Sequence, residues 1–272
     1  MNITANLDVT IRPKSEAGGL NVIWRHMPRD IFDFRTCEGV VYGNKDLGLF
    51  QVKMPTSIGN GIRCWRKDGN NFSYMWPYKD NVDVHIVVEP KDDHLLLTYS
   101  VLNVGQRTIK DVQIHTCIPT TEAPNFYPQP IDKGTEKSWS ELYDRLFVWI
   151  NQRPVKLSST SLGASQPHLS LVQKGKPEIN WGWWVNTPER FDIPLIALTS
   201  HNLKSTIALA FENARWASSN TGDDRACFHL FPWFGTIEPG QRSVVTGLLL
   251  FTKGGPESAM TAYQKVRTHQ NR

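Results

Sequence analysis

Two histidines have the chemistry and the local setting of a proton-transferring pair. His115 stands in the run VQIHTCI, and His229 stands in the run ACFHLF. An imidazole changes its protonation state near neutral pH, so two of them facing one substrate can exchange protons with it. The alternative for each is a hydrogen-bonded histidine that only supports the structure. We predict that His115 and His229 are catalytic residues.

The stretch before His229 adds polar groups that suit ligand binding. Strand alternation would place Arg225, Cys227 and His229 on one face, and Asn220 and Asp224 stand in a polar, turn-rich segment just before them. A guanidinium offers a rigid fork of hydrogen-bond donors. The alternative is a solvated loop followed by an ordinary core strand. We predict that Arg225, Asn220 and Asp224 bind substrate.

Tryptophan is frequent in this chain, with ten in 272 residues, and three of them crowd into the run NWGWW at residues 180–184. One strand cannot direct all three indoles into one core, so at least one should line a groove, and exposed aromatic patches usually mark binding sites. The alternative is two sheets that share the indoles. Indoles stack on the C–H faces of pyranoses, so we predict saccharide contacts for Trp181, Trp183 and Trp233.

A smaller cluster near the N-terminus contains Trp24, Arg25 and His26. We predict that Arg25 and His26 reach the same face as the proposed site and bind substrate there. The eight histidines are dispersed along the chain, so only tertiary contact could bring His26, His115 and His229 together as metal ligands. We predict no metal.

The cysteines and the short motifs indicate no cofactor. Cys37, Cys64, Cys117 and Cys227 form no CxxC pair and lack zinc-ribbon spacing. Cys117 and Cys227 lie in apolar runs, where a thiol usually behaves as a small buried hydrophobe. The sequence has no GxSxG elbow, HExxH pair, P-loop or dinucleotide fingerprint. We therefore predict that the protein needs no cofactor.

Charge and hydropathy exclude several classes of partner. The net charge is +4 and the basic residues are scattered, whereas nucleic-acid binding needs a basic stripe. No apolar run approaches the roughly 20 residues that span a bilayer, and the N-terminus lacks the features of a signal peptide. We expect a soluble protein, cytoplasmic as written or secreted or periplasmic if a leader was removed, without nucleic-acid or membrane partners. A homo-oligomer is compatible with the sequence.

Alternating apolar and polar residues dominate the chain. Short β-branched and aromatic runs are separated by turn clusters such as PKDD, NVGQRT and EPGQ. This pattern predicts an all-β protein with an antiparallel sandwich. The predicted strands cover residues 83–89, 95–101, 112–118, 195–198, 206–211, 226–231 and 244–251.

Helical signal is weak and confined to two segments. Residues 138–147 have a capping-box spacing, and residues 256–267 have basic residues near their end, so each predicts one short helix on the sheets. Residues 125–137 and 158–179 are predicted loops. Because strand patterning resumes after both, we predict one β-sandwich domain over residues 1–272.

The runs HLLLTYSVLNVGQRTIKDVQIHTCI and ACFHLFPWFGTIEPGQRSVVTGLLLF resemble the galactose mutarotase-like superfamily over about residues 80–252. The resemblance implies an antiparallel β-supersandwich with a sugar cleft on one concave sheet. In that superfamily an Asn-centred turn precedes a strand that ends in a catalytic His. Asn103 and His115 match this element, and the turn that begins at Glu238 matches the family's closing Pro-Gly turn.

One departure from the family pattern affects the expected chemistry. The epimerases carry a general-base Glu on the late strand, and His229 stands at that place here, with Glu238 nine residues later. A pair of histidines could move the protons instead. We therefore predict a carbohydrate-active protein of epimerase, lyase or glycosidase type. The alternatives are a non-catalytic carbohydrate-binding module and a sandwich whose tryptophans bind a protein partner.

Overall fold

The structure is a computed structural model of the whole chain. It describes residues 6–12, 19–44, 48–53, 65–77, 82–127, 136–163, 165–176, 178, 184–221 and 226–270. Within these segments, only the backbone is described for residues 36–44, 48–53, 76–77, 136–139 and 269–270.

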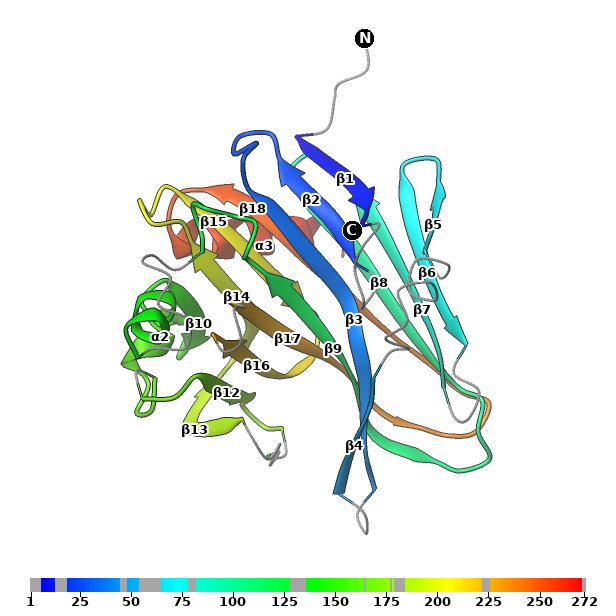
Figure 1. The fold of residues 1–272 in the computed structure, drawn as a ribbon. Helices are drawn as coiled ribbons and strands as arrows, with labels where there is room; N and C mark the ends of the chain where they lie inside the picture. The colour runs from blue at the N-terminus through cyan, green and yellow to red at the C-terminus, as the bar shows by residue number, and fades with distance from the viewer. Residues whose placement is uncertain are drawn as a thin grey trace.

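Two nine-stranded sheets face each other (Figure 1). The first sheet has the order β1-β2-β3-β9-β17-β16-β12-β13, with β4 paired to β3. Its neighbours are antiparallel except for β12 and β13, which are parallel. Its strands are β1 (Leu7–Ile11), β2 (Leu20–Trp24), β3 (Ile31–Asn44), β4 (Gly48–Lys53), β9 (Ile109–Pro119), β12 (His168–Gln173), β13 (Val185–Phe191), β16 (Ala214–Asn220) and β17 (Cys227–Ile237).

The second sheet is antiparallel throughout and has the order β11-β10-β14-β15-β18-β8-β7-β6-β5. Its strands are β5 (Trp65–Asp68), β6 (Asn71–Pro77), β7 (Val82–Pro90), β8 (His94–Asn103), β10 (Leu146–Ile150), β11 (Arg153–Lys156), β14 (Ile193–Thr199), β15 (Ser205–Phe211) and β18 (Arg242–Lys253). The helical elements are α2 (Glu136–Tyr143), the short 3-10 helix η1 (Leu157–Ser159) and α3 (Pro256–Gln270).

The main core lies between the two sheets and follows from strand alternation. On β7, every second side chain from Val82 to Val88 is buried, and the inward residues of β9 and β17 include Ile114 and Phe228. Helix α3 covers the outer face of the second sheet, where Tyr263 packs on β14, β15 and β18 (Figure 1). No helix in the described part of the chain is long and apolar enough to cross a bilayer.

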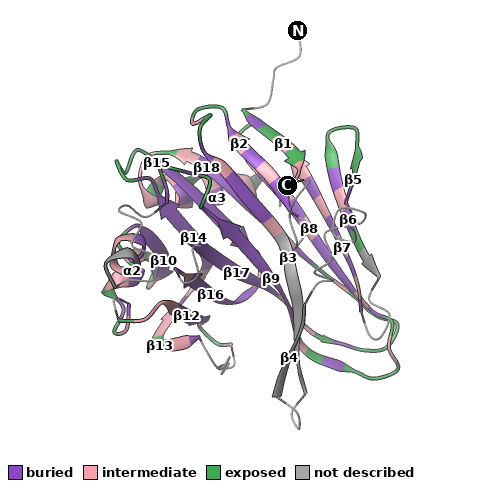
Figure 2. Cartoon of the chain, in the orientation of Figure 1, coloured by how far each residue is buried: buried purple, intermediate pink, exposed green. Residues whose placement is uncertain are grey.

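The central strands of the first sheet are buried on both faces (Figure 2). On β9, Ile114 belongs to the main core cluster, so His115 points to the opposite face. On β17, Phe228 belongs to the core cluster, so Cys227 and His229 point to the opposite face. We call this second surface of β9, β17 and β16 the polar face, because it carries these histidines and cysteines.

The predicted all-β antiparallel supersandwich is confirmed. All seven predicted strands fall on observed ones, namely β7, β8, β9, β14, β15, β17 and β18, and the predicted C-terminal helix is α3. The one parallel pair, β12 with β13, lies at the edge of the first sheet.

Two predicted boundaries are wrong. The helix expected over residues 138–147 ends at Tyr143, because the apolar run Leu146–Ile150 pairs with β14 as a strand. The loop expected over residues 158–179 contains β12, whose short HLSLVQ run pairs with β16. Most of the other expected loop, residues 128–135, lies outside the described residues.

Replacing Phe228 with Ala should lower the free energy of unfolding by about 3–5 kcal/mol, because the ring is fully buried in the main core. Urea unfolding measures the change. Val244→Ala is the control, since Val244 is 49% exposed and its truncation should change stability by less than about 0.5 kcal/mol. Equal losses in the two variants would contradict the assignment of the core face.

Candidate functional site

The two predicted catalytic histidines lie against each other on the polar face. β9 and β17 are antiparallel neighbours, and Cys117 stands directly opposite His229. His115 lies two residues before Cys117 and so shares its face. The ring centroids of His115 and His229 are 4.7 Å apart, with an interplanar angle of 60°. Both imidazoles are therefore within reach of one reacting atom.

Aromatic rings hold this histidine pair in place. Phe231 stacks on His115 with a centroid distance of 4.6 Å and an interplanar angle of 9°. Trp184 meets His229 edge-on at 5.5 Å and 85°, and His168 meets Trp184 edge-on at 5.3 Å and 72°. The pair is buried, with 8% of His115 and 2% of His229 exposed.

His229 has a defined partner at each ring nitrogen. Its Nδ1 is hydrogen-bonded to the Ser218 hydroxyl at 3.2 Å, and its Nε2 lies 3.2 Å from Cys227 Sγ. Burial holds the pKa of His229 well below its ordinary value, and the neighbouring charges of His115 and Arg35 act in the same direction. His229 is therefore neutral at neutral pH and can accept a proton.

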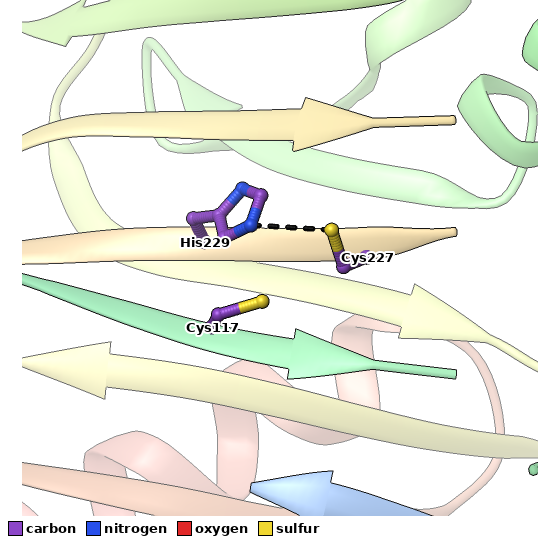
Figure 3. Close-up of side chains that lie close together, drawn as sticks. All are labelled: Cys117, Cys227 and His229. Carbon is purple, nitrogen blue, oxygen red and sulfur yellow. Dashed lines mark hydrogen bonds between the residues drawn. The ribbon is translucent and has the colours of Figure 1, made fainter. Parts of the chain in front are cut away.

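Two buried thiols complete the cluster around His229. Cys117 and Cys227 are buried thiols, and their Sγ atoms and one nitrogen of His229 all lie within 4.8 Å of one another (Figure 3). The predicted burial of these thiols is confirmed. Both thiols lie on the polar face beside an imidazole, however, and not in the hydrophobic core, where small apolar side chains would pack. This donor set can hold a metal ion.

The polar face also carries buried polar atoms that lack hydrogen bonds. Gln113 is fully buried, and neither atom of its side-chain amide has a partner in the described part of the chain. Trp233 stands opposite Gln113, and its indole Nε1 also lacks a partner among the described residues. Because such atoms cost free energy, they favour a site where a ligand or water satisfies them.

The other predicted binding residues fall at three places. Asn220 ends β16 directly opposite Cys227, so it lies on the polar face next to the thiols. The ring of Trp233 lies under the ammonium group of Lys176, 3.9 Å from the centroid. Burial lowers the pKa of that ammonium group. The remaining four, Asp224, Arg225, Trp181 and Trp183, lie outside the described residues.

Arg25 and His26 lie at a different place from the histidine pair. Arg25 forms an ion pair with Asp8 at 2.6 Å, and the His26 ring lies 4.8 Å from that of Trp24. Both line a cavity of about 810 Å³ whose other walls include Phe251 and part of α3. Neither His115 nor His229 lines this cavity. A substrate contact of Arg25 and His26 at the histidine pair stays a prediction.

Asn103 and Glu238, which matched the family pattern, support the turns. The Asn103 amide donates to the carbonyls of Arg107 and Ile237 at 2.8 and 2.9 Å, and its oxygen accepts from the Gly105 amide. Glu238 accepts from the Thr108 hydroxyl. Ile237 lies eight positions after His229 on β17, about 26 Å along an extended strand. Glu238 therefore cannot serve as the base beside the histidines.

Several residues of the site were not predicted. Gln113 lies two residues before His115 and Phe231 lies two residues after His229, so alternation alone could have identified them. Ser218 and Trp184 come from β16 and from the residue before β13. Only strand pairing brings these two to His229, and no local pattern indicates it.

Comparison with known proteins shows the fold of this chain. No protein-family model matches it, and no curated protein matches it in sequence. The solved Slr1438 protein of Synechocystis is 9% identical, with 93% of this chain and 94% of that chain covered and a TM-score of 0.50. A galactose mutarotase-like protein from Lactobacillus casei is 9% identical, with coverages of 92% and 98% and a TM-score of 0.50. The chain therefore has the galactose mutarotase-like fold.

Replacing Gln113 with the similarly shaped Met should raise the free energy of unfolding by about 1–3 kcal/mol, because it removes two buried polar atoms that lack partners. Denaturant unfolding measures the gain. Asn103→Leu is the matched control and should destabilise, because it breaks three hydrogen bonds of a buried amide. A loss of stability in Gln113→Met would show that the amide is satisfied in the free protein.

Proposed function

We propose that the protein binds a saccharide on the polar face and acts on it by acid–base chemistry. The observation that carries the proposal is the contact of two buried imidazoles, His115 and His229, 4.7 Å apart on the face opposite the core. The fold adds support, because the same architecture occurs in a protein described as galactose mutarotase-like. The reaction would be of epimerase, lyase or glycosidase type.

The environment of the pair favours different roles for the two histidines. His229 is held neutral by burial, so it would accept a proton from the substrate at Nε2 in place of its contact with Cys227. His115 would return a proton to a second oxygen of the same sugar. In an epimerisation at the anomeric carbon, His229 would take the proton of the anomeric hydroxyl while protonated His115 gives a proton to the ring oxygen, which breaks the bond from the anomeric carbon to the ring oxygen. The two reverse transfers then close the ring on the other face of the carbonyl, so both histidines regain their starting protonation states.

Groups around the pair would orient the sugar. Gln113 and Asn220 would bind hydroxyl groups from opposite ends of the polar face, and Trp233 and Trp184 would present ring surface to the C–H groups. Arg225, Asp224, Trp181 and Trp183 are proposed to complete the binding surface, with Arg25 and His26 as further candidates.

A non-catalytic saccharide-binding protein is the second candidate function. It is favoured by the residues that β17 presents on the polar face, which are Cys227, His229, Phe231 and Trp233. This strand, described over its full length, offers no carboxylate there. A binding protein would need the aromatic and amide groups of the site but no proton transfer.

We also propose that residues 1–272 act as one domain. Both sheets contribute to the same main core cluster, in which Phe34 and Ile118 of the first sheet join Tyr99 and Phe211 of the second. Such a shared core favours cooperative unfolding as one unit.

Replacing either His115 or His229 with Gln should lower turnover of a sugar substrate by at least about 100-fold, the usual effect of removing a general acid or base. A panel of aldoses and oligosaccharides is followed by NMR for anomeric exchange and for new products. His94→Gln is the control, because His94 lies in the second sheet and bonds Asp93, and it should keep full activity. Unchanged turnover in both site variants would remove the pair from the mechanism.

Replacing Trp184 or Trp233 with Ala should weaken saccharide binding by about 5-fold, since a lost ring contact costs roughly 1 kcal/mol. Isothermal titration calorimetry measures the affinity, and His94→Gln again serves as the control. Binding that depends on these tryptophans without any product would favour the binding protein over the enzyme. If no saccharide binds and none is converted, the proposed function is wrong in both forms.

A further inference from the structure

Three metal-ligating side chains meet at one point of the polar face. The Sγ atoms of Cys117 and Cys227 and one nitrogen of His229 all lie within 4.8 Å of one another (Figure 3). Cys117 is the direct cross-strand neighbour of His229, and Cys227 lies two residues before His229 on the same face. The donors therefore sit on the backbones of two paired strands, which hold them in fixed relative positions.

The spacing of the donors suits a tetrahedral zinc ion. Zinc binds a thiolate sulfur at about 2.3 Å and an imidazole nitrogen at about 2.0–2.1 Å, so tetrahedral ligand atoms lie about 3.5–3.8 Å apart. The distance from Cys227 Sγ to His229 Nε2 is 3.2 Å, and no pair among the three donors exceeds 4.8 Å. Small side-chain rotations would bring all three to bonding distance.

Ser218 gives His229 the support that metal-bound histidines have. A ligating histidine usually donates the N–H of its other ring nitrogen to a hydrogen-bond acceptor, which fixes the tautomer and the ring orientation. The Ser218 hydroxyl lies 3.2 Å from Nδ1 of His229, while Nε2 faces Cys227. With the proton on Nδ1, Nε2 presents its lone pair to the thiols.

The charge balance also suits a buried divalent cation. Two thiolates and a neutral imidazole neutralise an ion of charge +2, so the assembly avoids the cost of an unpaired buried charge. Cys117 and Cys227 are 2% and 4% exposed. Thiolate and imidazole ligands are those that zinc prefers over carboxylate and carbonyl oxygens.

We propose that Cys117, Cys227 and His229 form a zinc-binding site in which Ser218 orients His229. Three protein ligands leave one tetrahedral position for a water molecule or a substrate oxygen. The inference goes beyond the proposed function and does not depend on it, because zinc binding is measured without a sugar. Since zinc would occupy Nε2 of His229, proton transfer in the loaded protein would fall to His115.

The test uses the full chain, reduced and stripped of metal with a chelator. We expect one zinc ion per chain by calorimetry, and a cobalt(II) derivative with the thiolate-to-cobalt charge-transfer bands of tetrahedral coordination. Cys117→Ser and Cys227→Ser should each weaken zinc binding by more than about 100-fold, and Ser218→Ala should weaken it by about 10–100-fold. Zinc should raise the Tm of the parent protein through binding to the native state.

Three controls keep the result decisive. The double variant Cys37→Ser/Cys64→Ser removes the other thiols and should bind one zinc as tightly as the parent, and His94→Gln should do the same. If a ligand variant fails to fold, Ser218→Ala and the zinc-dependent Tm of the parent decide the matter. The proposal is wrong if the cobalt form lacks charge-transfer bands, if both single cysteine variants keep the parent affinity, or if the double variant loses it.

Discussion

The candidate site depends on one constraint, the register in which β9 pairs with β17. Cys117 stands opposite His229, and the two-residue alternation of strands then puts His115, Cys227 and Phe231 on the same face. A shift of one residue would turn these side chains into the core and bring Ile114 and Phe228 to the polar face. The apolar residues that alternate with these side chains on β9 and β17 therefore fix the register, because they must face the second sheet.

A polar surface buried inside a sheet protein lowers stability unless its atoms are paired. Asn103 shows the satisfied case, since all of its hydrogen bonds close a turn. Gln113 shows the opposite case, with both amide atoms lacking partners in the described part of the chain. This contrast separates a buried amide that joins parts of the sandwich from one whose polar atoms the described residues leave without partners. It is the strongest physical reason to seek a ligand on the polar face.

The proton-transfer proposal and the zinc proposal both assign a role to His229. As a neutral, buried imidazole it can accept a proton, and with Nε2 beside Cys227 it can also bind a metal ion. The two uses of Nε2 exclude each other at any one moment. Occupancy of the thiol cluster would thus set whether both histidines or His115 alone take part in proton transfer, and Nδ1 of His229 stays with Ser218 in either case.

The sequence by itself determined that the protein is an antiparallel β-sandwich and located seven of its strands, namely β7, β8, β9, β14, β15, β17 and β18, because alternation and turn residues are local signals. It also predicted that His115 and Cys117 share one face and Cys227 and His229 another. It missed the short strands β10, β11, β12, β13 and β16, and it gave little for residues 1–80, although β1 to β4 extend the first sheet. Only the tertiary structure decided that the two faces are one, because pairing between β9 and β17 joins residues more than a hundred positions apart. The same long-range pairing brought Ser218 and Trp184 to His229 and placed Arg25 and His26 at another cavity.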